Sequence, residues 1–286
     1  MTQVVAIVRL ARPHFLLGGL LLFALGAFST GSLDAGGYAI GQAMVTATQL
    51  TAHLVNESAD ARADALVRNR TWFSGGSGAI ADGSVSPRTA LVAALFTSAV
   101  AVGFIGLMYA RNPQAASIGV AALLVAWLYS VEPIRLLATG IGEIVTTLVV
   151  AMGVPIVGAL ANGGSVAEPL RWAIVALLPI HLAMMLCFEL PDLDTDREAS
   201  KRVAAVRLGR QRTEALVGVL FGLGGGVLAV GIVTGHLPDL ALAAFAAATP
   251  AAVAMWAMRR ARWGALTLGA VATLVVAALG LLVALA

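Results

Sequence analysis

The sequence predicts an all-α, polytopic membrane protein with nine transmembrane helices. Three observations support this fold class. Of the 286 residues, 59% are hydrophobic and only 12% are charged, with a mean hydropathy of +0.92. Nine apolar stretches approach or exceed the roughly 20 helical residues that cross a bilayer. The basic residues gather in alternate connections. A water-soluble chain of this length has too little polar surface to cover so many apolar side chains.

The nine stretches follow one another with short connections, apart from two long ones. The first comes after Arg9, Arg12 and Pro13 and has no small-residue cleavage site behind it. We therefore expect it to be retained and not removed as a signal peptide. The single cysteine, Cys187, lies inside the sixth stretch, so no intramolecular disulfide is expected. The predicted spans are residues 13–31, 37–55, 89–110, 114–131, 139–161, 171–190, 213–235, 238–258 and 264–285.

The distribution of basic residues predicts how the chain crosses the membrane. With a cytoplasmic N-terminus, only Arg111 and Arg171 of the 18 lysines and arginines fall outside. This bias is the positive-inside pattern of membrane proteins. We expect an integral, multi-pass protein of a prokaryotic inner membrane, with the N-terminus inside and the C-terminus outside. The net charge of +3 follows this topology and does not indicate a nucleic-acid partner.

The two long connections each begin with an acidic cluster. Residues 56–88 join the second and third spans, and residues 191–212 join the sixth and seventh. We interpret residues 1–286 as a single domain in which these segments form cytoplasmic caps, since loops of this length are often functional. The matching offset of the two clusters suggests two related halves that face each other across a central cavity.

The acidic clusters indicate a cation site. The first reads N-x-x-x-D-x-x-x-D and contains Asn56, Asp60 and Asp64, and the second reads D-x-x-x-D, from Asp192 to Asp196. Four-residue spacing keeps side chains on one face of a helix. Gathered carboxylates repel one another unless a cation lies between them, and hard oxygen ligands suit Mg²⁺. Because Mg²⁺ in such sites usually retains water and substrate phosphate as ligands, we expect a diphosphate site at a membrane boundary.

Further segments, in order with these clusters, resemble the UbiA superfamily of intramembrane prenyltransferases. The resemblance covers most of the chain and is closest to the menaquinone-type branch, which prenylates 1,4-dihydroxy-2-naphthoate. Glu57 and the Val203-Ala204 pair depart from the pattern of that branch, so they leave the acceptor open. The segments that carry the resemblance are Leu10–His14, Phe73–Ser77, Tyr129–Leu136, Gly140–Glu143, Glu189–Arg197, Lys201–Arg202 and Val206–Gly209.

The resemblance implies an activity and two metal sites. The expected reaction is the Mg²⁺-dependent transfer of a polyprenyl group from its diphosphate to an aromatic acceptor, with menaquinone biosynthesis as the first candidate pathway. Asn56, Asp60 and Asp64 would hold one Mg²⁺, and Asp192 and Asp196 a second.

Other side chains would bind the substrates. The strongest candidates for direct diphosphate partners are Arg135 and Lys201, although a positive-inside anchor is an alternative role for any single arginine. Glu143 would orient or deprotonate the acceptor. The remaining substrate-binding candidates are Arg12, Arg70, Ser74 and Tyr129.

Two alternatives remain open from the sequence. The same fold could act on another acceptor, such as a benzoate, a lipid alcohol or a tetrapyrrole, or could cyclise a terpene. A secondary transporter is the alternative from another class, but transporter sites lie near the bilayer midplane. Here the carboxylates gather at span ends beside cationic loops. The expected partners are a polyprenyl diphosphate, an aromatic acceptor and the lipid bilayer, while the oligomeric state stays open.

Overall fold

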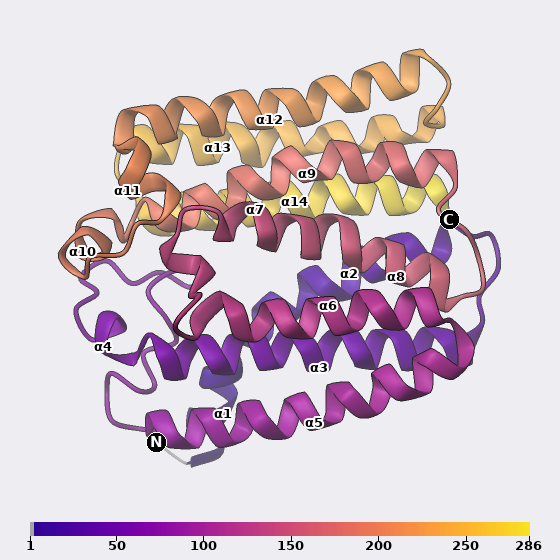
Figure 1. The fold of residues 1–286 in the computed structure, drawn as a ribbon. Coiled ribbons are helices and arrows are strands. Elements are labelled where there is room, and N and C mark those ends of the chain that lie inside the picture. Colours follow the sequence, from indigo (N-terminus) through magenta and orange to yellow (C-terminus); the bar gives the residue numbers. More distant parts are fainter. Residues whose placement is uncertain (1–2) are drawn as a thin grey trace.

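The computed structural model describes residues 3–286, and every regular element in this range is helical. The long helices run side by side along a common direction (Figure 1). Within the described residues, eight segments are long and apolar enough to span a membrane. They are Val5–Phe28, Pro87–Arg111, Pro113–Ser130, Gly142–Ala161, Glu168–Glu189, Arg210–Val233, Asp239–Arg259 and Trp263–Leu285.

The predicted second span is the exception to this count. It forms α3 (Ala35–Ala59), which has 25 residues and packs against α5 (Pro87–Arg111) and α6 (Pro113–Ser130). α3 is not one of the eight apolar segments, because it contains several threonines, glutamines and other polar residues. The all-helical membrane fold is therefore confirmed, whereas composition counts eight spans and not nine.

Several spans consist of more than one helical segment. The first combines α1 (Gln3–Ala11), η1 (Pro13–Phe15) and α2 (Leu16–Phe28), with Arg12 in the left-handed conformation at the break. The others are α7 (Gly142–Thr147), η3 (Leu148–Gly153) and α8 (Val154–Ala161), then η4 (Asp239–Ala247) and α13 (Ala248–Arg259). The unbroken spans α9 (Glu168–Glu189), α12 (Arg210–Val233) and α14 (Trp263–Leu285) complete the set.

Local sequence signals set the helix starts. Asn112 caps α6 by accepting hydrogen bonds from the N–H groups of Gln114 and Ala115, both at 3.0 Å, and Pro113 follows as the first helical residue. Ser86 caps α5 in the same way, with Pro87 next. These are favoured capping arrangements, because the cap satisfies otherwise unpaired N–H groups and proline has none to lose.

Glycines allow two of the spans to approach closely. A Cβ atom at Gly26 of α2 would collide with the Pro155 carbonyl, and one at Gly158 of α8 would collide with the Phe23 carbonyl. In a bilayer, no hydrophobic driving force brings helices together. Small residues at such contacts let the backbones approach closely and gain van der Waals packing.

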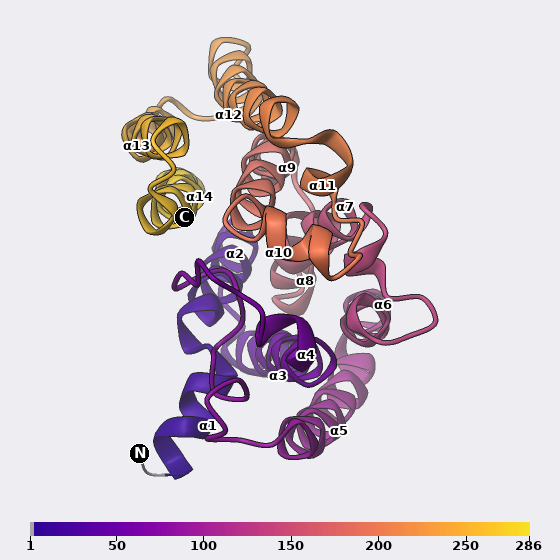
Figure 2. The same ribbon diagram turned by 90° about the vertical axis from the view of Figure 1, so that its left-hand side faces the viewer.

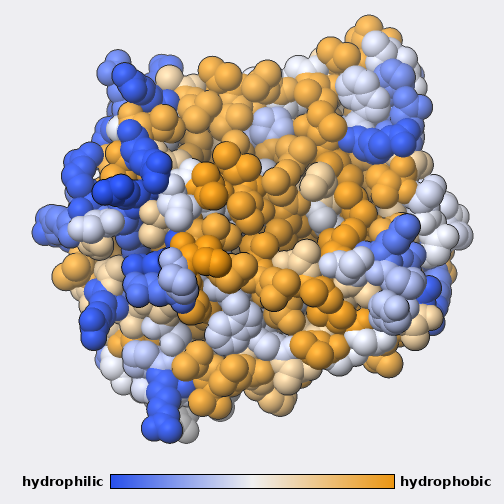
Figure 3. Space-filling model, in the orientation of Figure 1, coloured by the Kyte–Doolittle hydropathy of each residue, from blue (hydrophilic) through white to orange (hydrophobic). Residues whose placement is uncertain are grey.

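The surface matches a bilayer. Figure 3 shows a broad apolar belt across the middle of the molecule, with hydrophilic residues towards both ends. Outward-facing Phe96 is 70% exposed and Leu95 is 54% exposed. A continuous apolar surface of this kind is typical of lipid contact.

Both long connections lie at one end of the bundle, here named the motif end (Figures 1 and 2). Because α3 continues to Ala59 and α12 begins at Arg210, these connections are shorter than the predicted 56–88 and 191–212. The first cap segment, residues 60–86, contains α4 (Ala61–Asp64). The second cap segment, residues 190–209, contains α10 (Leu193–Glu198) and α11 (Ala204–Leu208).

Candidate metal and diphosphate site

The first acidic cluster lies where α3 ends. The predicted unbroken helical face from Asn56 to Asp64 is wrong, because α3 stops at Ala59 and the chain restarts as α4 after Asp60. Asn56 still contacts its neighbours: its Nδ2 donates to Asp60 Oδ2 at 3.3 Å and to Ser130 Oγ at 3.2 Å. The helix break therefore changes the direction of the chain, but Asn56 and Asp60 remain in contact.

Asp60 is the most heavily paired carboxylate of the site and is only 4% exposed. Its Oδ1 accepts a hydrogen bond from Arg135 Nη2 at 2.8 Å, and its Oδ2 accepts one from Lys201 Nζ at 3.0 Å. Arg135 and Lys201, the two predicted diphosphate partners, thus both contact Asp60, a predicted metal ligand.

The second acidic cluster meets the first through the same lysine. Asp192 precedes α10 and Asp196 lies within it, and Lys201 Nζ is 3.6 Å from Asp196 Oδ1. One ammonium group therefore touches Asp60 from the first cluster and Asp196 from the second. Residues more than 130 positions apart in the chain converge at one point of the motif end.

Two other carboxyl groups of the site form no ion pair within residues 3–286. Burial, followed by the charges of Asp60 and Glu57, raises the pKa of Asp64 to about 7. Burial, followed by the charges of Asp196 and Asp64, raises the pKa of Asp192 to about 7. Since the charge of Asp64 acts on Asp192, the two clusters lie within electrostatic reach.

Burial also acts on the groups that Lys201 joins. It raises the pKa of Asp196 despite the neighbouring lysine. Although burial lowers the pKa of Lys201, the charges of Asp60 and Asp196 raise it above its ordinary value. Asp194, between the motif carboxylates, instead points to solvent with 74% of its side chain exposed and lies 3.6 Å from Arg197.

The donor set suits a hard divalent cation. In residues 3–286, no three histidine, cysteine, aspartate or glutamate side chains already converge at metal-binding distance. Mg²⁺ needs fewer protein ligands, because one or two carboxylates and substrate phosphates commonly hold it. Asp192 Oδ1 is buried and has no hydrogen-bond partner among the residues that the structure describes, which is the state expected of an oxygen that binds a cation. The carboxylates therefore fit Mg²⁺ together with a phosphorylated ligand.

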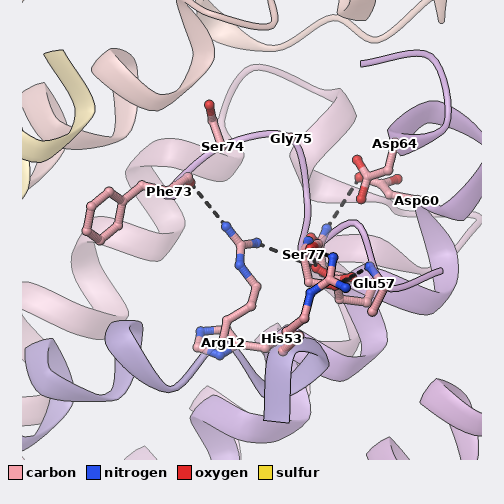
Figure 4. A network of polar contacts seen from close by, with 12 residues as sticks. Arg12, His53, Glu57, Asp60, Asp64, Phe73, Ser74, Gly75 and Ser77 are labelled. Carbon is pink, nitrogen blue, oxygen red and sulfur yellow. Dashed lines mark hydrogen bonds and ion pairs between the residues drawn. The ribbon is translucent and has the colours of Figure 1, made fainter. Parts of the chain in front are cut away.

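The other predicted arginines hold the first cap segment. Arg12 donates to the Phe73 carbonyl at 3.2 Å (Figure 4). Arg70 donates from Nε to the Gly75 carbonyl at 2.8 Å and from Nη2 to the Asp64 carbonyl at 2.9 Å. Ser74, 5% exposed, pairs its hydroxyl with Thr71 at 3.0 Å. These contacts are with the loop itself and not with the motif carboxylates.

Glu57, which departs from the sequence pattern of the menaquinone-type branch, is a buried acid. It is 2% exposed, and its carboxylate accepts hydrogen bonds from the Ser77 N–H at 2.6 Å and the Ser77 hydroxyl at 2.5 Å. Arg12 Nη1 lies 3.9 Å away. Its place next to Asn56 was the available signal, since an acid inside an apolar helix needs partners.

The glycines of the first cap segment are required by its path. Gly75, Gly76 and Gly78 all have positive φ angles, of 81°, 70° and 76°. A Cβ atom at Gly76 would collide with the Asp64 carboxylate. Glycine here permits a left-handed backbone and lets the loop lie directly against the acidic cluster.

Glu143 and Tyr129 lie beside the site. Glu143 is 2% exposed, and its Oε1 accepts a hydrogen bond from the Ala204 N–H at 3.3 Å. Tyr129 is close enough to Glu143, Glu189 and Asp60 for their charges to act on it. Glu189 was not among the predicted site residues, although its spacing of three from Asp192 was a signal.

Solved structures share this architecture. A UbiA homologue from Archaeoglobus fulgidus, bound to GPP and Mg²⁺, has a TM-score of 0.70 at 15% identity, with 97% of this chain and 99% of that chain covered. A UbiA homologue from Aeropyrum pernix K1 gives 0.69 at 19% identity, covering 94% and 95%. A digeranylgeranylglyceryl phosphate synthase gives 0.65 at 14% identity, covering 100% and 99%.

A comparison with curated proteins finds no match. The model of the UbiA prenyltransferase family, however, matches residues 15–265, a range that includes both acidic clusters, both cap segments and the residues around them. With the helical architecture and the convergence of the two clusters on Lys201, this match shows that the chain belongs to the UbiA prenyltransferase family.

Proposed function

We propose that this protein transfers a polyprenyl group from its diphosphate to an aromatic acceptor, with 1,4-dihydroxy-2-naphthoate as the first candidate acceptor and Mg²⁺ as the cofactor. The observation that carries the proposal is the contact of Lys201 with both Asp60 and Asp196, because it brings the two acidic motifs to one buried point. The resemblance of the segments around the motifs to the menaquinone-type branch supports the acceptor.

The proposed site divides its ligands between the two motifs. Asn56, Asp60 and Asp64 would hold one Mg²⁺, and Asp192 and Asp196 the other. When bound, the metal would neutralise charge that develops on the departing diphosphate. Cationic side chains at a buried position strengthen that effect, since charges interact more strongly away from water.

Lys201 and Arg135 would supply the protein's own positive charge. In the resting arrangement they neutralise Asp60, at 3.0 and 2.8 Å. In the proposed reaction they turn to the diphosphate once the carboxylate serves as a metal ligand. A guanidinium group suits this task, because its planar donors match phosphate oxygens.

Aromatic rings would shield the reacting carbon from water. Phe73 of the first cap segment stacks on Phe188 of α9, with ring centroids 5.8 Å apart, and Phe15 packs edge-on against both, at 5.5 and 6.0 Å. These ring contacts pack the first cap segment against the helix bundle next to Arg12. An allylic cation formed here would be kept from water, as transfer to an acceptor requires.

The proposed orientation places the motif end in the cytoplasm of a prokaryotic cell. Sixteen of the 18 lysines and arginines fall in the segments assigned to the cytoplasm, as the positive-inside rule demands. A polyprenyl diphosphate in the inner leaflet would then have its headgroup at the depth of the acidic clusters and its tail among apolar helices.

The test uses the full-length protein in liposomes with Mg²⁺, geranylgeranyl diphosphate and 1,4-dihydroxy-2-naphthoate. Pyrophosphate release and a prenylated product, identified by mass spectrometry, are expected, and chelation of Mg²⁺ should abolish both. A panel with a hydroxybenzoate and a lipid alcohol separates the acceptor from the activity. Product from one of these alone would replace the naphthoate, and Mg²⁺-independent transfer would contradict the metal site.

A further inference from the structure

A cavity between α1 and the first cap segment, here named the α1 cavity, has no role in the proposed reaction. Its volume is about 560 Å³, which is within the range of about 300–1,000 Å³ that is typical of ligand pockets. Val5, Val8 and Arg9 of α1 line it on one side, and Arg70 and Trp72 of the cap segment on the other. Among the described residues that line it, none is acidic, so the cavity is suited to an anion and not to a metal ion.

Two arginines from the two sides of the α1 cavity lie close together. A Cβ atom at Gly78 would lie 2.5 Å from Arg70 Nη1 and 3.3 Å from Arg9 Nη2. Arg9 also contacts Asp82 Oδ2 at 2.8 Å, whereas the hydrogen bonds of Arg70 go to two carbonyl groups of the cap segment. Like charges at this separation repel each other, and an anion between them would offset the repulsion.

Two further polar side chains of the first span line the same cavity, Arg12 and His14. Arg12 has a side chain that is 11% exposed and lies 3.9 Å from Glu57. His14 Nε2 is buried and has no hydrogen-bond partner among the described residues. A buried polar atom left unpaired costs free energy, and an imidazole N–H can donate to a phosphate oxygen. His14 therefore also points to a ligand that offers acceptor oxygens.

The apolar part of the lining belongs to the membrane boundary. Val5 and Val8 are 46% and 52% exposed, and both lie in the first apolar span, Val5–Phe28. Trp72 is 81% exposed, and exposed tryptophans are favoured at the membrane–water interface. The α1 cavity thus combines cationic groups with lipid-facing apolar side chains, as the binding of an amphiphile requires.

We propose that the α1 cavity binds an anionic phospholipid, with the headgroup phosphate between Arg9 and Arg70 and an acyl chain along Val5 and Val8. Guanidinium groups match phosphate oxygens in geometry as well as charge. A prenyl diphosphate fits less well, because it is commonly bound together with Mg²⁺ and the lining provides no carboxylate for the metal. In the proposed orientation the cavity opens to the cytoplasmic leaflet, whose surface is negative.

This lipid site does not depend on the proposed transfer reaction, but it has a consequence for the cap. Arg9 belongs to α1, whereas Arg70 and Trp72 belong to the first cap segment. A headgroup that contacts both would hold the cap segment against the first span. Amide hydrogen exchange at residues 70–77 should therefore slow when the lipid is bound.

The test measures lipid binding to the full-length protein in detergent by native mass spectrometry, without prenyl diphosphate or acceptor. Phosphatidylglycerol is compared with phosphatidylcholine of the same acyl chains, and tighter binding of one phosphatidylglycerol is expected. Arg9→Gln should weaken that binding about fivefold. Asp82→Asn is the matched control, because it removes the same ion pair but keeps the guanidinium group, and it should bind phosphatidylglycerol at least as tightly as wild type.

Equal weakening by Arg9→Gln and Asp82→Asn would mean that only the ion pair between the two residues matters, and the lipid site would be wrong. Equal affinity for the two lipids would also overturn it. Geranylgeranyl diphosphate and inorganic phosphate, each added with a chelator, are the competing anions. Displacement of phosphatidylglycerol by either at an equal or lower concentration would assign the α1 cavity to the substrate or to a free anion instead.

Hydrogen exchange and prenyl transfer keep the lipid site apart from the proposed function. Phosphatidylglycerol should slow exchange at residues 70–77 in wild type more than in Arg9→Gln, and an equal effect would contradict the site. Selective lipid binding by a wild-type protein that transfers no prenyl group would support the lipid site and overturn the transfer reaction. Normal transfer by a protein that binds both lipids equally would overturn the lipid site alone.

Discussion

Asp60 and Asp192 occupy comparable places in the two acidic motifs, yet their surroundings are electrostatically opposite. Asp60 is paired with Arg135 and Lys201 at 2.8 and 3.0 Å. Asp192 forms no ion pair with another group in residues 3–286, and its Oδ1 is buried without a partner. Asp60 therefore has its own counter-charges, whereas Asp192 depends on a cation from outside. The charge of Asp60 thus stabilises the ligand-free protein, whereas the charge of Asp192 is available to bind a ligand.

Removing each carboxylate is the strongest test of this comparison. Both Asp60→Asn and Asp192→Asn should lower prenyl transfer by on the order of 10²–10³-fold, because each removes a group that organises charge around the diphosphate. Their effects on the metal-free protein should have opposite signs. Asp60→Asn removes the nearest carboxylate from both Arg135 and Lys201, and breaking a buried pair costs about 3–5 kcal/mol. Asp192→Asn removes an unmatched buried charge, so the melting temperature should rise.

Asp194→Asn is the control for both variants, because Asp194 lies between Asp192 and Asp196 with its side chain 74% exposed. Thermal melts in detergent without Mg²⁺ and pyrophosphate release in liposomes provide the two readouts. Equal destabilisation by Asp60→Asn and Asp192→Asn would contradict the proposal that the two carboxylates have opposite effects on stability.

Lys201 is the side chain on which the two motifs meet. Lys201→Gln should lower transfer by about 10²-fold and lower the melting temperature, because Asp60 and Asp196 lose a shared counter-charge. Arg202→Gln, at the exposed neighbouring position, should change neither measurement. Partial recovery by Lys201→Arg would show that the charge matters more than the ammonium geometry. An unchanged transfer rate in Lys201→Gln would remove the lysine from the site.

Beside the first motif, the buried acid Glu57 holds the first cap segment through hydrogen bonds to Ser77. Glu57→Gln weakens two hydrogen bonds to Ser77, and bonds to a charged group are worth about 1.5–3 kcal/mol. Amide hydrogen exchange at residues 74–78 should accelerate, and transfer should fall by about tenfold. Asp194→Asn, in the second cap segment with its side chain 74% exposed, is the control. Unchanged exchange at these residues would show that Glu57 does not hold the loop.

The smallest expected effect concerns the packing of the first cap segment against Asp64. Gly76→Ala and Gly83→Ala both place a side chain at positive φ, 70° and 75°, which costs about 1 kcal/mol. Only the side chain at Gly76 would collide with Asp64, since nothing lies near Gly83. Both variants should lose similar stability, but only Gly76→Ala should lose transfer, by a few fold. Equal transfer rates would mean that the loop does not shape the acidic cluster.

Much of the fold was available from the sequence, because hydropathy and helix length are local. The predicted span 89–110 corresponds to α5 at Pro87–Arg111, and 264–285 corresponds to α14 at Trp263–Leu285. The first span differs most: it begins at Val5 and bends at Arg12, which takes a left-handed conformation that hydropathy does not encode. The polarity of α3 was likewise visible, but its place inside the bundle depends on its neighbours.

The site was predictable as a set of residue types but not as a set of contacts. Spacing indicated Asp60 and Asp192, whereas the pairing of Asp60 with Arg135 and Lys201 joins residues 75 and 141 positions apart. No local pattern specifies such pairs. The break of α3 at Asp60 was also invisible, because the four-residue spacing continues through it.

The position of Lys201 has a consequence for titration of the protein with divalent cations. Its ammonium group is shared by both motifs, so a ligand that displaces it from Asp60 also loosens its hold on Asp196. Occupancy of one motif should thereby ease occupancy of the other, and the metal-binding isotherm should be sigmoidal, with a Hill coefficient above one. In Lys201→Gln this cooperativity should vanish, which leaves two independent sites.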